Sequence, residues 1–378
     1  MKVIILGAGL VGGPMAIDLQ KDKEFKITIA DINKERLDFL AGNTGIKTIQ
    51  HDLADKAALK KLVSGYDLVL SAVPGFMGFE TLKTLIEAGK DVIDIAFFPE
   101  DLLELDELAK SKNVRVISDI GVAPGMSNIL SAYAVSQLDK AESIKIYVGG
   151  LPKKRSLPWE YKAVFSPIDV IEEYTRPARF VENDKIITKE PLTDPEFLEF
   201  DQVGTLEAFN SDGLRSLIKT IDCPNMIEKT LRYPGHIDKI KVLKESGFFD
   251  EKEISIQGNK IRPIDFTTSV LFPKWKLEPG ESDLTVMKII VSGIKNDRAQ
   301  TIQYDLYDEY DPESGIHSMA RTTGYTATTA LRMMAKGLYT RKGVSAPEFI
   351  GEDKDCVDFM LARLKERGIF YQKKQHIS

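Results

Sequence analysis

The feature that most constrains this chain is a glycine-rich turn between a short apolar stretch and an amphipathic one. Residues 2–6, KVIIL, are typical of a buried parallel strand and run directly into GAGLVG. Residues 15–19 then continue with helical spacing. In this context Gly7 permits a tight turn, Gly9 lets the backbone approach a pyrophosphate, and Gly12 lets the helix pack on the strand. The pattern therefore predicts a dinucleotide-binding fold.

A second apolar stretch supports this interpretation. Residues 26–30, KITIA, form the next expected strand and end at Asp31, nineteen residues after Gly12. An acidic residue at this distance hydrogen-bonds the adenosine ribose in dinucleotide-binding folds. A glycine-rich turn without a ligand would not explain Asp31. Because the Asp31 carboxylate would repel a 2′-phosphate, the sequence favours NAD over NADP.

Strand and helix patterns alternate up to about residue 122. Six strands with intervening helices predict an α/β domain at residues 1–123, with a Rossmann-type, doubly wound parallel sheet. Ligands bind beyond the carboxyl ends of such strands, where Asp52, Ser71 and Asp94 fall. An ordinary strand-end loop is the alternative at each position. The cofactor-binding residues expected from these patterns are Gly7, Gly9, Leu10, Val11, Gly12, Asp31, Asp52, Ser71, Ala72, Val73 and Pro74.

A different pattern begins near residue 124. Longer alternating stretches, such as 283–291, predict an α+β substrate domain with a mixed sheet at residues 124–325, expected to carry the catalytic and oligomer contacts. The stretch 283–291 is suited to pairing across an interface, so we expect a homodimer or a higher homo-oligomer. The C-terminal helices of residues 326–378 are expected to pack back on the first domain, with a frayed end from Gln372.

Charge and composition exclude several classes of protein. The 378 residues carry a net charge of −6, whereas a nucleic-acid-binding chain would present a basic face. The two cysteines, Cys223 and Cys356, cannot build a disulfide framework or a cysteine zinc site, and no residues have metal-ligand spacing. No run of about twenty apolar residues is present to span a membrane. We therefore expect a cytoplasmic protein that binds no metal, nucleic acid or membrane.

The second domain holds polar residues in contexts unlike an exposed helix face. Arg232 and His236 flank a Pro-Gly turn, and Arg321 and Thr322 lie near the start of a late helix. Arginine can hold a carboxylate through two hydrogen bonds, and a helix start favours an anion. A surface salt bridge is the alternative for each arginine, and a hydrogen-bonded structural role is the alternative for His236. These residues indicate an NAD-linked enzyme with a small anionic substrate.

Residues 119–130, DIGVAPGMSNIL, resemble the saccharopine reductase-like dehydrogenases, and among them the lysine 6-dehydrogenases. The resemblance covers nearly the whole chain in order. It also rests on the opening GAGLVG and on residues 137–144, 147–152, 160–162, 164–166, 204–209, 230–236, 319–325 and 341–344.

The resemblance implies a Rossmann domain joined to an α/β substrate domain, with a nicotinamide cofactor that serves reactions at C–N bonds. It implies NAD-dependent oxidative deamination of the ε-amine of L-lysine or a related amine, giving an aldehyde or cyclic imine and ammonia. The amine must first lose a proton, for which His236, Asp94 and Tyr161 are the candidates in that order. Anchors expected for the α-carboxylate are Arg232 or Arg321, with Thr322 and Asn128 as lesser partners.

One segment departs from the lysine 6-dehydrogenases, which contain glycine and histidine after the fifth strand. Here that place holds Phe97 and Phe98, which are expected to face the substrate and so to affect the choice of amine. Two alternatives to lysine deamination therefore remain. One is a reductase of the saccharopine-forming or carboxynorspermidine type that joins an amine to an aldehyde. The other is a non-catalytic NAD-binding regulatory protein.

Overall fold

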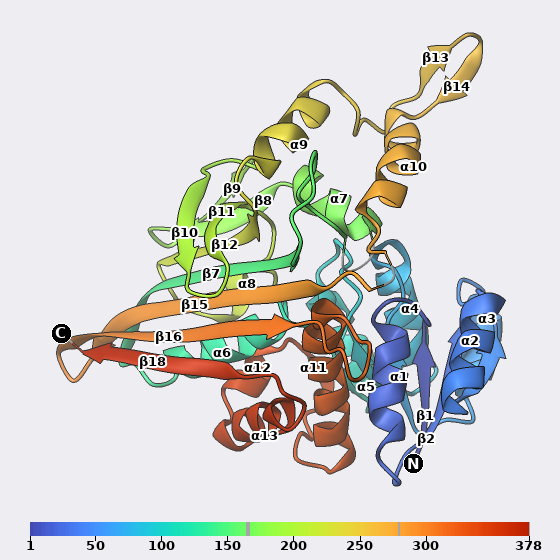
Figure 1. Ribbon diagram of the computed structural model, residues 1–378. Helices are drawn as coiled ribbons and strands as arrows, with labels where there is room; N and C mark the ends of the chain where they lie inside the picture. The colour runs from blue at the N-terminus through green and yellow to red at the C-terminus, as the bar shows by residue number, and fades with distance from the viewer. Residues whose placement is uncertain (164–166, 279, 378) are drawn as a thin grey trace. The chain divides into compact units, whose positions relative to one another are not determined.

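The computed structural model describes residues 1–163, 167–278 and 280–377 (Figure 1). The chain folds into two compact units. The first contains residues 1–139, 219–221 and 319–371, and the second contains residues 140–218, 222–318 and the chain from residue 372 onward.

The first unit is built on a seven-stranded sheet in the order β17-β6-β5-β4-β1-β2-β3, and all its neighbouring strands run parallel. Its strands are β1 (Lys2–Leu6), β2 (Lys26–Asp31), β3 (Lys47–Gln50), β4 (Leu68–Ser71), β5 (Asp91–Asp94), β6 (Arg115–Ile117) and β17 (Gly343–Ser345). Its helices are α1 (Gly12–Gln20), α2 (Lys34–Thr44), α3 (Lys56–Val63), α4 (Gly75–Glu87), η1 (Leu102–Leu105), α5 (Asp106–Ser111), α6 (Met126–Val135), α11 (Ser318–Ala335), α12 (Glu348–Gly351) and α13 (Lys354–Lys365). The first residue of α11, Ser318, belongs to the second unit.

The apolar runs form these strands because both faces of the sheet are covered. Four register partners on one face are 0% exposed, and so are their chain neighbours on the other face: Ile4, Val69, Val92 and Val116, and Ile5, Leu70, Ile93 and Ile117. A parallel sheet buried on both faces is the expected environment for continuous apolar strands. The α/β fold with a parallel Rossmann-type sheet is therefore confirmed.

The second unit contains a mixed sheet in the order β10-β11-β12-β7-β15-β16-β18, with β8 on β12 and β9 on β8. β7 and β12 run parallel, whereas β15 is antiparallel to both β7 and β16. The strands are β7 (Lys140–Pro152), β8 (Ala178–Glu182), β9 (Lys185–Lys189), β10 (Glu196–Phe200), β11 (Gly204–Asn210), β12 (Asn225–Arg232), β15 (Asp283–Lys295), β16 (Arg298–Glu309) and β18 (Tyr371–Ile377). A separate hairpin joins β13 (Ile254–Ile256) to β14 (Asn259–Ile261). The helices are α7 (Pro167–Thr175), α8 (Leu217–Thr220), α9 (His236–Glu245) and α10 (Pro263–Trp275). Of α8, only Leu217 and Ile218 belong to this unit.

The limits of the units differ from the expected limits at residues 123 and 325. α6 belongs to the first unit because it packs closely on α12: a Cβ at Gly351 would lie 2.3 Å from the Ile129 carbonyl oxygen. α11 belongs there from Met319 and lies beside α1 (Figure 1), where the Thr328 hydroxyl donates to Asp18 Oδ2 at 2.6 Å. The expectation of a frayed C-terminus is wrong, because residues 371–377 form β18 beside β16.

Candidate functional site

The glycine-rich turn of the first unit is fixed by close backbone contacts. Gly7 has φ +99°, and a Cβ at this position would lie 2.5 Å from the Ala72 carbonyl oxygen. A Cβ at Gly12 would lie 2.0 Å from the carbonyl oxygen of Gly7. Both positions therefore require glycine: the first for its conformation, and both for the close approach of backbone. The stretch from Ser71 to Pro74 accordingly adjoins the turn through Ala72.

The surroundings of Gly9 fit an anionic ligand. A Cβ at Gly9 would meet only the Arg36 Nη1 atom, at 3.8 Å, so the packing of the protein itself leaves space there. Leu10 and Val11 lead into α1, whose first turn contains no acidic residue. The positive end of the helix is therefore not neutralised by its own side chains, as a pyrophosphate site requires.

Asp31 lies at the carboxyl end of β2 and braces the turn. Its Oδ2 accepts a hydrogen bond from Ala8 N at 2.6 Å, and its Oδ1 accepts one from Asn33 N at 2.7 Å. Arg36 approaches the same loop, with Nη1 3.4 Å from the Ala8 carbonyl oxygen. A carboxylate and a guanidinium therefore border the place where the adenosine ribose of a dinucleotide would bind.

The other expected cofactor residues occupy strand ends. Asp52 follows β3, is exposed, and accepts a hydrogen bond from Ala54 N at 2.9 Å through Oδ1. Ser71 ends β4 and is fully buried, Val73 is 5% exposed, and Pro74 caps the start of α4. Asp52 thus stabilises its own turn, and its contact with a cofactor stays a prediction.

Asp94 ends β5 and is a fully buried carboxyl group beside two serines. Its Oδ2 accepts a hydrogen bond from Ser118 Oγ at 2.8 Å, and Ser71 is its register partner on β4. Burial raises the pKa of Asp94 to about 7; the hydrogen bond from Ser118 opposes this shift, and the nearby Asp119 adds to it. The carboxyl edge of the sheet therefore carries an acid that changes charge near neutral pH.

Phe98 does not have the role that the resemblance implies. It is 0% exposed in the core of the first unit, with its ring 5.7 Å from that of Phe79. A Cβ at Gly78 would lie 2.8 Å from the Phe98 ring, so the helix leaves room for the aromatic side chain. Because Phe98 fills this core, the expectation that it faces the substrate is wrong. Phe97 is half-buried, and its effect on substrate choice stays a prediction.

The second unit holds Arg232 in a buried polar cluster. Arg232 is 2% exposed and donates from Nη2 to Glu173 Oε2 at 2.5 Å, from Nε to the Tyr174 hydroxyl at 3.3 Å, and from Nη1 to the Leu231 carbonyl oxygen at 2.9 Å. Burial raises the pKa of Glu173, although Arg232 opposes this effect. The guanidinium is thus already occupied, and a substrate carboxylate would have to displace Glu173.

His236 belongs to the same cluster, and both nitrogens of its imidazole ring are hydrogen-bonded. Its Nδ1 lies 3.0 Å from the Trp159 carbonyl oxygen, which can only accept, so Nδ1 carries the proton. Nε2 therefore accepts from the Tyr174 hydroxyl, 3.0 Å away. Burial, aided by the nearby Arg232 charge, lowers the pKa of His236 to about 3. His236 is a neutral residue with both ring nitrogens engaged, a geometry that favours a structural role over that of a base.

Tyr161 lies against the same arginine. The Arg232 Cζ atom is 4.5 Å from the centre of the Tyr161 ring, and the ring stacks edge-on against Trp275 at 5.4 Å. The hydroxyl is buried and has no hydrogen-bond partner among the described residues. Burial raises the pKa of Tyr161 well above 10, so its phenol stays protonated at neutral pH.

The sequence reasoning missed two acids of the second unit: Glu228, which is buried, and Glu173, which is half-buried. Glu228 is 3% exposed and accepts a hydrogen bond from Ser211 Oγ at 2.8 Å, and burial raises its pKa to about 8. Glu228, Thr230 and Arg232 alternate along β12, so the period of two was a signal that these polar residues share one face. Glu173 lies on α7 and gave no comparable signal.

The remaining expected substrate residues lie in the first unit and have partners of their own. Arg321 is 8% exposed and donates from Nη2 to the Arg367 carbonyl oxygen at 2.9 Å. Asn128 is fully buried, donates to Glu348 Oε2 at 3.2 Å, and accepts from Ser127 Oγ at 2.9 Å. Thr322 is fully buried in α11. Substrate binding by these three residues stays a prediction.

Two searches of residues 1–163, 167–278 and 280–377 bear on other ligand classes. These residues contain no group of three or more His, Cys, Asp or Glu side chains placed to hold a metal ion. None of their helices is long and apolar enough to cross a membrane. Residues 164–166, part of the family resemblance, lie outside the described residues.

Comparison with known proteins identifies the family. Residues 3–117 match the saccharopine dehydrogenase NADP binding domain, and residues 121–369 match the saccharopine dehydrogenase C-terminal domain. The chain belongs to the saccharopine dehydrogenase family. The family resemblance inferred from the sequence motifs is therefore confirmed, and a nicotinamide dinucleotide-binding domain is present. The particular likeness to the lysine 6-dehydrogenases stays a prediction.

Saccharopine dehydrogenase [NADP(+), L-glutamate-forming] from Schizosaccharomyces pombe is 29% identical over 66% of this chain and 58% of the relative, so the match spans little more than half of that protein. The enzyme of the same name from Pyricularia oryzae is 27% identical over 99% of this chain and 98% of the relative. Carboxyaminopropylagmatine dehydrogenase from a Synechocystis species is 25% identical over 97% of this chain and 96% of the relative.

The structure of apo saccharopine dehydrogenase (L-Glu forming) from Saccharomyces cerevisiae superposes with a TM-score of 0.82 over 99% of both chains, at 21% identity. This likeness confirms the fold. The dehydrogenase relatives support an oxidoreductase activity. Because the two saccharopine dehydrogenases are named for NADP(+), the expected preference for NAD stays a prediction.

Proposed function

We propose that this member of the saccharopine dehydrogenase family is an NAD-dependent oxidoreductase that oxidises the ε-amine of L-lysine or a related amine. The carbon bearing the amine loses a hydride, the nitrogen loses a proton, and water releases ammonia from the resulting imine. The observation that carries the NAD dependence is the glycine turn held by Asp31, whose Oδ2 lies 2.6 Å from Ala8 N, and the choice of the ε-amine rests on the resemblance to the lysine 6-dehydrogenases.

The first unit supplies the residues that would hold the dinucleotide. Gly7 and Gly12 allow the tight backbone packing of the turn, Gly9 leaves space for a pyrophosphate, and Asp31 would accept hydrogen bonds from the adenosine ribose. A bound nicotinamide ring supplies a hydride acceptor. The Asp31 carboxylate disfavours a 2′-phosphate, which supports NAD even though relatives are named for NADP(+).

Asp94 is the strongest candidate for the proton acceptor. A free lysine amine has a pKa of about 10.4, so at neutral pH a base must remove its proton before hydride leaves. Asp94 has a pKa of about 7 and lies at the carboxyl edge of the sheet, where ligands of this fold bind. We rank it above His236, whose ring nitrogens are both occupied, and Tyr161, whose pKa is too high.

Glu173 is the strongest candidate for recognition of a cationic amine. Its side chain is 22% exposed, whereas that of its partner Arg232 is 2% exposed. A partly exposed carboxylate attracts an ammonium group, and the arginine beneath it fixes its position. We therefore assign amine recognition to Glu173 and positioning of Glu173 to Arg232, instead of the carboxylate anchor expected from the sequence.

A second candidate function is the reductive joining of an amine to an aldehyde. Carboxyaminopropylagmatine dehydrogenase matches nearly the full length of both chains, over an alignment of only 392 positions. A compact chain of this family can therefore act on a substrate larger than lysine. Saccharopine-forming or carboxynorspermidine-type chemistry is the corresponding reaction for this chain.

One assay separates these functions. Purified protein is given NAD and, separately, L-lysine, ornithine, cadaverine and longer polyamines at alkaline pH, and NADH and ammonia are measured. NADH and ammonia formed in equal amounts from lysine would establish deamination. NADH consumed only when an amine and an aldehyde are both present would establish the joining reaction. Tight NAD binding without turnover in either direction would instead indicate a regulatory protein.

A further inference from the structure

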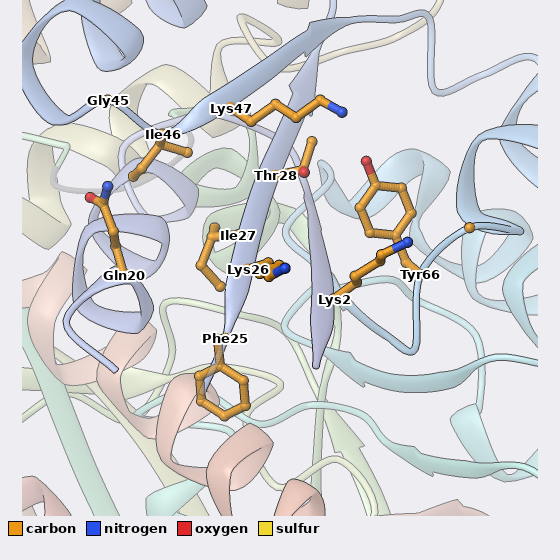
Figure 2. A pocket seen from close by; sticks show the side chains of 11 residues that line it. Lys2, Gln20, Phe25, Lys26, Ile27, Thr28, Gly45, Ile46, Lys47 and Tyr66 are labelled. Atoms are coloured by element: carbon orange, nitrogen blue, oxygen red, sulfur yellow. The ribbon is translucent and has the colours of Figure 1, made fainter. Parts of the chain in front are cut away.

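A groove of about 540 Å³ opens at the amino ends of β1, β2 and β3, within the first unit. Figure 2 shows the ammonium groups of Lys2, Lys26 and Lys47 around the same opening as the hydroxyl groups of Thr28 and Tyr66. Ligands of parallel sheets bind beyond the carboxyl ends of the strands, so this groove is separate from the dinucleotide site. Because β1 has five residues, the amino and carboxyl edges of the sheet lie about 17 Å apart along this strand.

The strand register brings the three lysines together. Lys2 and Lys26 are direct partners on the parallel strands β1 and β2, and Lys47 is the partner of Thr28 on β3. Partners in register extend to the same face of a sheet, and residues two apart on one strand also share a face. Three positive charges therefore lie on one face of three adjacent strands, where like charges repel one another.

The ammonium groups of these lysines have no carboxylate partner among the described residues, although Asp67 Oδ2 accepts a hydrogen bond from the backbone N–H of Lys2 at 2.7 Å. Among the described residues, Lys2, Lys26 and Lys47 form no ion pair, and the groove has no acidic residue in its lining. Acidic side chains are abundant, at 57 against 51 basic ones, and other exposed lysines of this unit use them. Lys34 pairs with Asp38, Lys56 with Glu80 and Lys60 with Glu87. The groove therefore differs from these positions in holding three lysines without an ion pair on adjacent strands around one opening.

We propose that this groove binds a small multivalent anion bearing phosphate or carboxylate groups. Lysine ammonium groups act as point charges for such anions, and the Thr28 and Tyr66 hydroxyls can donate hydrogen bonds to the same oxygen atoms. A bound anion would remove the repulsion between Lys2 and Lys26. The volume of about 540 Å³ exceeds what a single phosphate needs, which favours an anion with several charged groups.

The site is tested by calorimetric titration of the full chain with sodium pyrophosphate and, separately, with sodium citrate. Ionic strength is held constant with NaCl, and NADH is saturating so that the glycine turn is occupied. We expect binding of one anion per chain, and at least about tenfold weaker binding in the K2Q/K26Q/K47Q variant. Pyrophosphate alone would identify a phosphate ligand, and citrate alone a carboxylate ligand.

The control variant K61Q/K112Q/K365Q loses the same charge from exposed positions of the same unit and should bind as the wild type does. The proposal would be overturned if both triple variants lost affinity for the anion equally, or if neither anion bound saturably to the wild type. The single variant K26Q gives an independent readout: without anion it should be at least as stable as the wild type, because a repulsion is removed. Direct measurement of NADH binding in the same samples keeps a failed groove distinct from a failed dinucleotide site.

Discussion

Arg332 and Asp18 form an almost completely buried ion pair that joins α11 to α1, with Nη1 2.7 Å from Oδ2. Arg367 and the Thr328 hydroxyl also bind Asp18, at 2.8 and 2.6 Å. Burial alone would raise the pKa of Asp18, but these partners outweigh it and lower the pKa. Asp18→Asn should destabilise the protein by about 3 kcal/mol at pH 7, because Arg332 and Arg367 would both lose a buried counter-charge and Arg332 would keep only the more exposed Asp22. Denaturant unfolding measures this loss.

The pH dependence and a control sharpen the prediction for Asp18. Its contribution should be complete above its unfolded pKa of about 3.8 and should be lost as pH falls through the lower folded value. Asp38→Asn breaks the exposed pair with Lys34, whose side chains are 66% and 63% exposed, and should cost less than about 1 kcal/mol. Similar losses for the two variants would contradict the assignment.

Glu228 should destabilise the folded protein at alkaline pH. Its folded pKa of about 8 exceeds the ordinary value of 4.5, so the folded state keeps a proton that the unfolded state releases. Glu228→Gln should therefore gain stability over the wild type as pH rises from 4.5 to 8, by about 1.4 kcal/mol per unit, and level off above 8. Unfolding free energies at four pH values test this, with the exposed Glu313→Gln expected to show no such trend.

His236 should make the protein sensitive to acid. Its folded pKa of about 3 lies below the ordinary value of 6.5, so the unfolded state takes up a proton that the folded state excludes. Stability should fall as pH drops below 6.5, by about 2 kcal/mol at pH 5, and His236→Gln should lack this slope. The exposed His376→Gln variant should keep it. A slope that persists in His236→Gln would place the titrating group elsewhere.

Asp94 should control the pH profile of turnover. As a base with a pKa of about 7, it would give an activity that rises through pH 7 and levels off above it. Asp94→Asn should lower kcat by about 100-fold or more while leaving NAD binding nearly unchanged, and should be more stable than the wild type above pH 7.

Ser118→Ala provides a second test of Asp94. The Ser118 hydroxyl donates to Asp94 Oδ2 at 2.8 Å and favours the charged form, so its removal should move the activity profile to higher pH by up to about one unit. An unmoved profile, together with a nearly normal kcat in Asp94→Asn, would exclude Asp94 as the base.

Asp31 should determine the preference for NAD. Asp31→Asn keeps an oxygen that can accept from the Ala8 or Asn33 amide but removes the charge that repels a 2′-phosphate. We expect kcat/KM for NAD to fall and the preference for NAD over NADP to shrink by about tenfold or more. The Asp38→Asn variant, changed at an exposed position of α2, should keep the wild-type preference. A wild-type preference for NADP would refute the cofactor assignment directly.

Local spacing in the sequence was enough to predict the parallel sheet, the glycine turn and the family. Gly7 and Gly12 must be glycines because backbone oxygens lie where their Cβ atoms would be, so the signal and its cause lie within a few residues of each other or on an adjacent strand. The apolar run of β1 is likewise continuous because both faces of its sheet are buried.

The state of individual polar and aromatic side chains depended on the tertiary structure. His236 was predicted as a base and Arg232 as an anchor for a substrate carboxylate, yet Tyr174 and Glu173, far away in the sequence, bind these two side chains. Phe98 fills a core that only the packing of α4 creates. Spacing along the chain fixes which face of an element a residue occupies, whereas desolvation and choice of partner depend on segments brought together by folding. The sequence by itself therefore determined the elements and the dinucleotide turn, and only the tertiary structure decided which polar groups are buried, paired or shifted in pKa.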